Sequence, residues 1–213
     1  MPTEIHPGVY DITIRQDENG RRYRVYLVDD DVPTLVDTGF ANTTDALFEG
    51  IDATDLTPER VIITHADVDH VEGLPAVVDR YDVTTHVPEQ SDLENVSPDR
   101  RFGDGDRIGG FEAVYLPGHS SDHHALVHTD GDFLITGDAL SGADLRGFPE
   151  GYLLPHAALY AEDVHEAELN LERLLEYDFE AALTFHGTAV TEGAWDVVDR
   201  YVNFPGRPEE NVR

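Results

Sequence analysis

The chain lacks cysteine and lysine altogether, and no long hydrophobic run interrupts it. Without cysteine, neither a disulfide framework nor a thiolate metal ligand is possible. No apolar stretch approaches the roughly 18 residues of a transmembrane helix, so we expect no membrane partner. Residues 1–6 contain neither a basic region nor an apolar stretch. We therefore expect no signal peptide and a cytoplasmic protein.

Positively charged residues are scarce as well. All 14 basic residues are arginine, against 44 Asp and Glu, which gives a net charge of −30. Such a surface is typical of proteins from salt-accumulating halophiles, because a Debye length of about 3 Å at 1 M salt screens the repulsion. The charge argues against nucleic acid as a partner. A disordered acidic chain is excluded by apolar runs along the whole length and a hydrophobic fraction of 40%.

The 213 residues predict one domain, residues 1–205, with a loose tail at 206–213. Alternating or β-branched runs predict strands, and apolar residues at helical spacing predict helices. Asn19-Gly20 predicts a hairpin turn between the first two strands. The expected strands cover 9–14, 23–28, 35–36, 61–63, 83–87, 111–116, 124–129, 133–136 and 182–185. The expected helices cover 41–51, 74–81, 161–177 and 194–202. Periodicity alone leaves α/β and α+β open.

Side chains able to bind metal follow several of these strands. The first group, in Thr64-His65-Ala66-Asp67-Val68-Asp69-His70, comes directly after the run 61–63. Three further segments repeat the order of apolar strand and then ligand: Gly118-His119, Gly137-Asp138 and His186-Gly187. Imidazole and carboxylate together suit Zn, Mn and Fe. Because open sheets place their sites at strand ends, we expect these side chains to converge.

In these segments the sequence resembles the metallo-β-lactamase-fold hydrolases, the superfamily that includes glyoxalase II and the lactonases. The resemblance runs from about Val9 to Val202. The signature of the family is His-x-His-x-Asp-His, followed by a His, an Asp and a last His. It implies an α+β, four-layer αββα sandwich. It also implies two divalent metals. The first would be held by His65, Asp67 and His119, the second by Asp69, His70 and His186, with Asp138 bridging them.

Two positions depart from the family pattern. Asp67 stands where the second histidine of the signature is usual, and an oxygen there makes the first site harder and more negative. The metal identity therefore stays open, with Zn as the first expectation and Mn or Fe as alternatives. Glu72 occupies a position that is commonly glycine, and we interpret it as a helix-start carboxylate favoured by the helix dipole.

Other residues are expected around the metals rather than on them. By the resemblance Asp37, in Val36-Asp37-Thr38-Gly39, lies beside the metals, where it would orient a ligand imidazole. His123 is expected to support the ligands as well. His156 could form a wall of the pocket. The residues that contact substrate are unknown, although the side chains Arg146, Tyr152, Tyr160 and Trp195 are candidates.

The resemblance implies a hydrolase in which two metals share a hydroxide, generated because metal binding lowers the pKa of water towards about 7. Asp138 would hold the metals apart and Asp69 would orient the nucleophile, so both are expected to be catalytic. The substrate would be a small ester, thioester or lactone. A mononuclear iron enzyme resembling persulfide dioxygenases and a non-catalytic metal-binding protein are the alternatives. The oligomeric state cannot be predicted, and no Gly-x-Ser-x-Gly motif is present.

The charge yields a first testable prediction, that the fold needs salt. At about 0.01 M salt the Debye length is about 30 Å, so repulsion acts across the whole domain. With metal saturating, we expect the melting temperature to rise steadily between about 0.01 M and about 3 M KCl. A melting temperature that is flat or falls over this range would contradict a halophilic surface.

Overall fold

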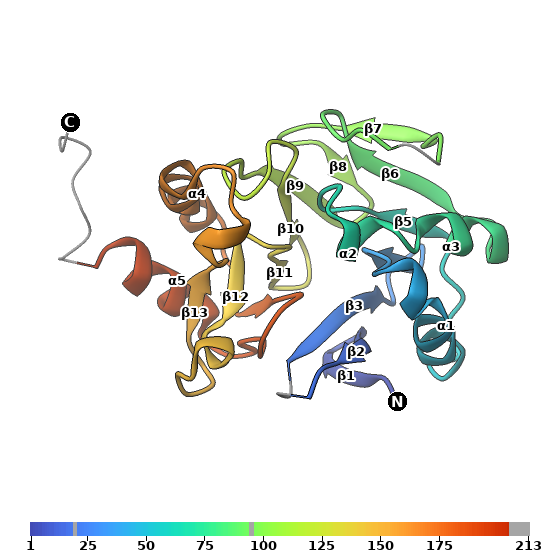
Figure 1. Ribbon diagram of the computed structural model, residues 1–213, viewed down its shortest axis with the longest axis horizontal. Coiled ribbons are helices and arrows are strands. Elements are labelled where there is room, and N and C mark those ends of the chain that lie inside the picture. Colours follow the sequence, from blue (N-terminus) through green and yellow to red (C-terminus); the bar gives the residue numbers. More distant parts are fainter. Residues whose placement is uncertain (19–20, 94–95, 205–213) are drawn as a thin grey trace.

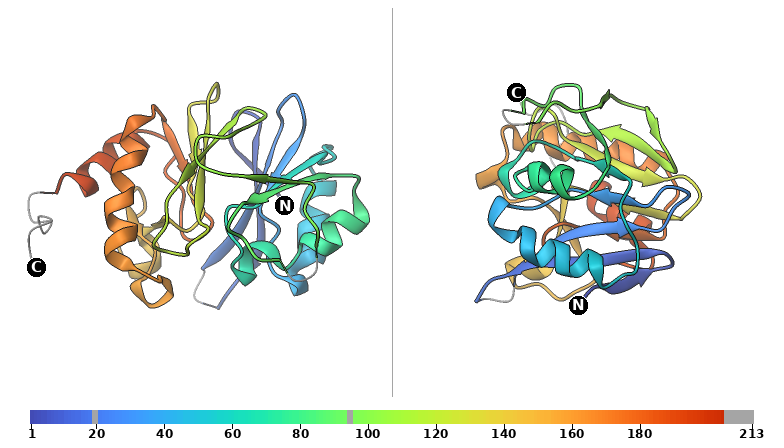
Figure 2. Two further views of the ribbon diagram at one scale, coloured as in Figure 1. Left: turned by 90° about the horizontal axis from the view of Figure 1, so that it is seen from above. Right: turned by 90° about the vertical axis from the view of Figure 1, so that its right-hand side faces the viewer.

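Two β-sheets packed face to face form the centre of the molecule, and helices cover their outer faces (Figures 1 and 2). The computed structural model describes residues 1–18, 21–93 and 96–204. The predicted α+β class and its four layers in the order αββα are confirmed. The hairpin turn expected at Asn19-Gly20 and the tail expected at 206–213 lie outside the described residues. The single domain over 1–205 stays a prediction.

The first sheet has seven strands whose order in space follows their order in the sequence. They are β1 (Thr3–His6), β2 (Val9–Gln16), β3 (Arg22–Val28), β4 (Thr34–Val36), β5 (Arg60–Ile62), β6 (Thr84–Pro88) and β7 (Arg100–Phe102). Strands β1 to β4 pair antiparallel, and β4 to β7 pair parallel. Strand β4 is buried along its whole length, as expected for a strand covered on both faces.

The second sheet has five strands in the order β14-β11-β10-β9-β8. Their bounds are β8 (Arg107–Ile108), β9 (Phe111–Tyr115), β10 (His124–His128), β11 (Phe133–Ile135) and β14 (Ala181–Leu183). Strands β10 and β11 pair antiparallel as a hairpin over Asp130-Gly131. A separate two-stranded ribbon pairs β12 (Leu140–Gly142) with β13 (Leu153–Pro155).

Over the described part of the chain, five α-helices and four short 3-10 helices lie outside the sheets. The α-helices are α1 (Thr44–Asp52), α2 (Val68–Val71), α3 (Leu74–Arg80), α4 (Val164–Asn170) and α5 (Ala194–Val202) among the described residues. The 3-10 helices are η1 (Ala41–Thr43), η2 (Ala143–Arg146), η3 (Ala158–Tyr160) and η4 (Leu171–Glu176). The chain places α1 to α3 against the first sheet and α4 and α5 against the second (Figure 2).

Three separate apolar clusters match these layers. The middle cluster joins facing residues of both sheets, such as Tyr26, Phe111 and Leu126. The second fills the space between the first sheet and its helices, and the third does the same for the second sheet. The middle cluster is apolar, and the ligand-capable side chains gather where the strands end.

Two helix predictions need correction. The helix expected over 161–177 is α4 followed by the 3-10 helix η4, and Val164, the first residue of α4, is exposed. The helix starts late because Asp163 caps it, accepting a hydrogen bond from the backbone of Glu166 at 3.0 Å. Residues 161–163 instead run beside the loop 118–119, as shown by hydrogen bonds from Glu162 and Asp163. The helix expected over 41–51 opens as η1, without a side-chain cap at Thr43.

Gly118 is required where this loop meets α4. Its φ of 122° is unusual for a residue with a side chain. A Cβ at Gly118 would lie 2.1 Å from the backbone nitrogen of Ala167, a contact that the helix cannot relieve without moving. The Gly118-His119 segment is therefore held in place by close packing against α4.

We expect Gly118→Ala to lower the free energy of unfolding by more than Gly105→Ala. Both glycines have positive φ, but a Cβ at Gly105 would meet nothing within 4 Å. The control should cost about 1 kcal/mol from backbone strain alone, and the clash at Gly118 should add about 1–3 kcal/mol. Urea unfolding of both variants measures the difference. Equal losses would show that α4 yields to the new side chain.

Candidate metal centre

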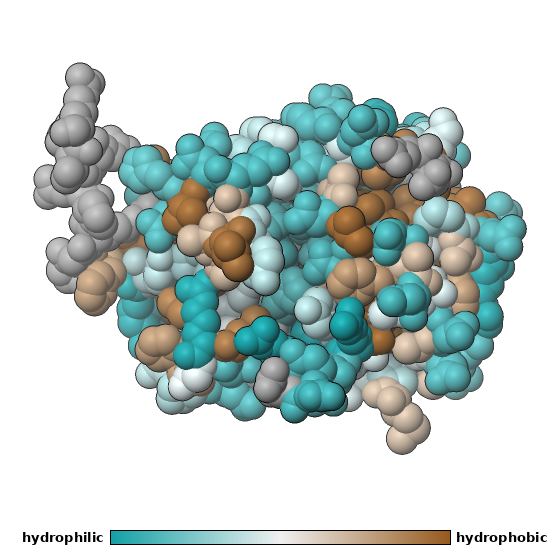
Figure 3. Space-filling model, viewed as in Figure 1, coloured by the Kyte–Doolittle hydropathy of each residue, from teal (hydrophilic) through white to brown (hydrophobic). Residues whose placement is uncertain are grey.

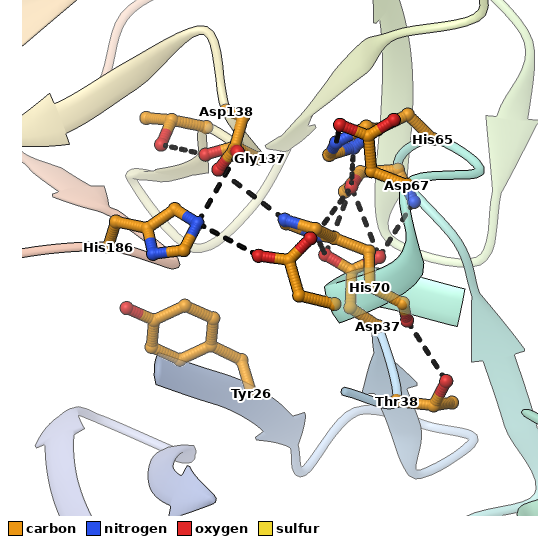
Figure 4. Close-up of polar contacts among 12 residues, drawn as sticks. Tyr26, Asp37, Thr38, His65, Asp67, His70, Gly137, Asp138 and His186 are labelled. Carbon is orange, nitrogen blue, oxygen red and sulfur yellow. Dashed lines mark hydrogen bonds and ion pairs between the residues drawn. The ribbon is translucent and has the colours of Figure 1, made fainter. Parts of the chain in front are cut away.

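The ligand-capable side chains predicted from sequence converge at one end of the sheets (Figure 4). Each comes from the loop that follows the carboxyl end of a strand. Residues 65–70 follow β5, His119 follows β9, Asp138 follows β11 and His186 follows β14. The loop after β5 turns into the short helix α2, which carries Asp69 and His70. The His70 ring lies beside that of His65, with centroids 4.0 Å apart.

The first set comprises His65, Asp67 and His119. Asp67 Oδ2 lies 3.0 Å from His119 Nε2 and 3.6 Å from His65 Nε2. His65 and His119 are buried, whereas the Asp67 side chain is 45% exposed at the pocket mouth. Asp67 thus faces the other two residues and does not turn away into solvent.

The second set comprises Asp69, His70 and His186. His186 Nε2 lies 3.2 Å from Asp69 Oδ2. His70 is fully buried, and its ring lies against Phe185 with centroids 3.8 Å apart. The three ligand atoms of this set form one group that could hold an ion.

The carboxylate of Asp138 lies between the two sets. Its Oδ1 is 3.4 Å from His70 Nε2, and its Oδ2 is 3.6 Å from His119 Nε2 and 3.4 Å from His186 Nε2. One buried carboxylate therefore faces imidazoles of both sets. Figure 4 shows His70 and His186 directed at it from two sides.

The chemistry of the cluster fits divalent metal. His65 Nε2, His70 Nε2 and Asp138 Oδ1 are buried without a hydrogen-bond partner among the described residues. Such atoms are rare in folded proteins unless they bind something. The printed separations within the sets, 3.0, 3.2 and 3.6 Å, lie around the edge of about 3.3 Å of a tetrahedron whose metal–ligand bonds are about 2.0–2.1 Å.

A family comparison decides the membership of the chain. The profile of the metallo-beta-lactamase superfamily matches residues 20–98 and 88–186. The chain belongs to the metallo-beta-lactamase superfamily. The matched segments contain every residue of the cluster, so the family assignment and the geometry refer to the same part of the molecule.

Individual relatives of this superfamily member are distant. A hydroxyacylglutathione hydrolase from Chelativorans sp. (strain BNC1) is 32% identical over 99 residues, 45% of this chain and 39% of that protein. The chain spans less than two thirds of the length of such curated relatives. A metallo-beta-lactamase from Pontibacter korlensis superposes with a TM-score of 0.75 at 19% identity, covering 95% of this chain and 96% of that one. TTHA1623 in a di-iron-bound form superposes with a TM-score of 0.68 at 24% identity, covering 86% and 95%.

Asp37 contacts the His70 imidazole and the backbone of the loop that carries the first four ligand candidates. Its Oδ2 lies 2.8 Å from His70 Nδ1, and its Oδ1 accepts from the backbone N–H of Thr64 at 2.8 Å. Thr64 Oγ1 in turn contacts His65 Nδ1 at 2.9 Å. One carboxylate therefore fixes His70 directly and His65 through Thr64, leaving both Nε2 atoms aimed at the centre of the cluster.

Asp122 is a supporting residue that sequence reasoning missed. It is buried and accepts hydrogen bonds from the backbone of Ala66 at 2.8 Å, from Ser91 Oγ at 2.5 Å and from Ser120 Oγ at 2.7 Å. These bonds tie the loop at 64–70 to the turn at 118–123. The Ser-Ser-Asp run before His123 gave no periodic or metal-spacing signal that could have identified it.

His123 supports Asp138 through the backbone. It is fully buried, and its Nε2 accepts the Asp138 backbone N–H at 2.9 Å. A Cβ on Gly137 would lie 2.6 Å from the same nitrogen, which explains the glycine there. The role of His123 in supporting the ligands stays a prediction. Glu72 lies between α2 and α3, directly before the Gly73 N-cap of α3, and its carboxylate accepts the backbone N–H of Ala41, the first residue of η1, at 3.2 Å.

A cavity of about 440 Å³ opens over the cluster. It lies in the hollow between the two halves on the face shown in Figure 3. Aromatic walls come from Tyr23, Phe40 and Tyr160, and Arg21 and Arg146 also line it. Of the substrate-contact candidates, Arg146 and Tyr160 reach this cavity. Tyr152 lines a different, more apolar cavity, and Trp195 packs against the core.

His156 also reaches the cluster. The sequence suggested only a wall of the pocket, but its Nε2 lies 3.8 Å from Asp138 Oδ2. The residue could form a further group with Asp138 and His186. Burial lowers the pKa of His156 to about 4, although the nearby Asp138 carboxylate opposes this shift.

The pKa values of His70, His186 and Asp67 are shifted towards their charged forms. Burial disfavours the charged forms, but neighbours of opposite charge outweigh it. Asp138 and Asp69 raise the pKa of His186 to about 9 despite burial. Asp37 and Asp138 likewise hold the pKa of His70 well above its usual value. Hydrogen bonds from His119 and His65 lower the pKa of Asp67. Metal must displace the protons of His70 and His186 in order to bind.

No helix within the described residues combines the length and apolar character that crossing a bilayer would require.

The raised pKa values predict opposite pH dependence for the metal-free and metal-loaded proteins. In the metal-free protein the stability contributed by His186 is present below about pH 6.5, the usual pKa, and is lost as the pH rises through about 9. We therefore expect the metal-free melting temperature to fall between about pH 6.5 and about pH 9.5 in high salt, and the stabilisation by added Zn to grow over the same range. His186→Gln should flatten both trends. A melting temperature of the metal-free protein that does not change with pH would contradict the protonation of His186.

Proposed function

We propose that this protein is a dinuclear metal-dependent hydrolase that cleaves a small ester, thioester or lactone-type bond. The observation that supports the proposal most directly is the position of Asp138 between two complete three-residue sets. Under the proposal, His65, Asp67 and His119 hold one metal. Asp69, His70 and His186 hold the other, and Asp138 bridges them.

A bound divalent metal lowers the pKa of water towards about 7 and polarises a carbonyl, which together supply a nucleophile and an electrophile. The chain's own residues supply the geometry. Asp138 fixes the separation of the two sets because its carboxylate faces imidazoles of both. Asp69 lies on the pocket side of the second set, within reach of a water that it could orient. Asp37 holds His70 in the required tautomer.

The pocket supports a small substrate with an apolar portion. Its volume of about 440 Å³ is of the size that a small molecule fills. Tyr23 and Phe40 form a tilted aromatic pair with centroids 5.6 Å apart, which offers an apolar surface beside the metals. Ser141, the aliphatic hydroxyl in the pocket lining, is hydrogen-bonded and buried, so a metal-generated nucleophile suits the site better. The hydroxyacylglutathione hydrolase relative supports including thioesters among the substrates.

An iron enzyme of a different reaction class is the second candidate. Asp67 contributes an oxygen where an imidazole is usual, which shifts the first set towards harder metals. The similar structure TTHA1623 was solved in a di-iron-bound form. Under this alternative a single iron would suffice, as in the persulfide dioxygenase-like chemistry that the sequence left open.

The test is metal uptake joined to a substrate panel. Protein purified in high salt and reconstituted with excess Zn or Mn should bind two equivalents and hydrolyse at least one ester, thioester or lactone. Uptake of one equivalent would contradict the dinuclear centre. A single equivalent of iron with O₂-dependent turnover and no hydrolysis would favour the second candidate.

We expect Asp138→Ala to reduce hydrolysis at least about tenfold more than Asp67→Ala, a difference of about 1.4 kcal/mol in the barrier. Asp138 faces both sets, whereas Asp67 belongs to one and is half-exposed. Steady-state rates with metal content measured in parallel test this. Equal losses with both metals retained would refute a bridging role.

A further inference from the structure

One imidazole lies against the cluster but outside both three-residue sets. The ring of His156 has its centroid 5.1 Å from that of His119 and 5.0 Å from that of His186. It therefore touches one residue of each set and faces the space between them. The ring of Tyr160 lies beside it, tilted, at a centroid distance of 5.6 Å.

The ribbon of β12 and β13 holds this imidazole in place. His156 directly follows β13, and Ser141 lies on β12, three residues after Asp138. The strands pair Leu140 with Pro155, which brings the two side chains together. Ser141 Oγ lies 2.7 Å from His156 Nδ1, and Arg146 Nη2 donates to the Pro155 carbonyl at 2.6 Å. The short segment that carries Asp138 thus also positions His156.

The hydrogen-bond pattern indicates which ring nitrogen carries the proton. Ser141 Oγ has no other hydrogen-bond partner within the part of the chain that the structure describes. Ser141 is buried, so its O–H needs an acceptor, and His156 Nδ1 provides it. The hydrogen of the neutral ring then resides on Nε2. That nitrogen is 3.8 Å from Asp138 Oδ2, too far for a hydrogen bond, so the N–H is available to the pocket.

We propose that His156 is a catalytic hydrogen-bond donor and that Ser141 is its positioning residue. The Nε2–H group donates to the carbonyl oxygen of a substrate in the pocket, where negative charge develops when the carbonyl carbon is attacked. No proton is transferred, and the imidazole stays neutral. The inference rests on the proposed hydrolase function for its substrate class, whereas the orientation of the ring rests on the contacts alone.

Two other roles make different predictions. As an extra metal ligand with His186, His156 would need its Nε2 lone pair, so Nδ1–H would donate to Ser141 and leave the buried hydroxyl without an acceptor. As a nucleophile activated by His156, Ser141 would be as essential as His156 itself. If His156 is a hydrogen-bond donor, its variants should keep both metals, and Ser141 should not be essential.

The first experiment compares His156→Ala, His156→Gln and Ser141→Ala in zinc-loaded protein, with the exposed His165→Gln as the matched control. We expect two zinc equivalents in every variant. His156→Ala should lower kcat about 10²-fold, as expected for the loss of one oxyanion donor, with a small change in KM. The amide of His156→Gln can still donate and should restore part of kcat. Ser141→Ala should lower kcat less than His156→Ala does.

The second experiment does not depend on hydrolysis. Long-range ¹H–¹⁵N NMR of the metal-free protein should show the Nε2–H tautomer of His156, and Ser141→Ala should shift it towards a mixture. Inorganic phosphate, a tetrahedral anion, should bind zinc-loaded His156→Ala about tenfold more weakly than wild type by calorimetry. If wild type hydrolyses nothing in the panel, the proposed function fails, and these two measurements still decide the role of His156.

Loss of one zinc equivalent in both His156 variants would overturn the proposal in favour of a ligand. An Nδ1–H tautomer, or unchanged phosphate affinity in His156→Ala, would overturn it as well. Equal loss of kcat in Ser141→Ala and His156→Ala, with the tautomer unchanged, would instead identify Ser141 as the nucleophile.

Discussion

The buried carboxylate of Asp138 is the constraint on which the rest of the site depends. Burying an ionised carboxylate costs several kcal/mol unless it is paired. Here the partners are imidazoles from the loops after three different strands, His70, His119 and His186, all within 3.6 Å of its oxygens. The loops at the end of both sheets must therefore close around one point. Either protons on the imidazoles or divalent cations can balance the charge, and metals do so while leaving a pocket open for chemistry.

Supporting residues explain how such a crowded polar centre keeps its geometry. Asp37 bonds to His70 and to Thr64, and Asp122 bonds to the backbone of Ala66. His123 accepts from the backbone of Asp138 itself. Contacts to the Nδ1 atoms of His65 and His70 leave the Nε2 atoms of both rings facing the centre of the cluster. The apolar clusters on both sides keep the sheets fixed while only the loops carry polar groups.

Much of the centre could be predicted from the sequence, because each ligand candidate directly follows an apolar strand and this order is visible in short stretches of sequence. The seven predicted residues do lie together, and the four-layer fold is as expected. Asp122 and the Ser141–His156 pair could not be predicted in the same way. Their roles depend on hydrogen bonds across 15 to 56 positions of sequence, made by a turn and by a three-residue ribbon too short for periodicity. The helix predicted over 161–177 was too long. Asp163 caps α4, and the backbone N–H groups of Glu162 and Asp163 donate to the loop at 118–119.

The most direct measurement of the central claim is anomalous diffraction from crystals grown in high salt with excess zinc. Two peaks about 3.5–4 Å apart, each touching one oxygen of Asp138, are the predicted result. One peak at full loading, or two peaks of which only one contacts Asp138, would contradict the account.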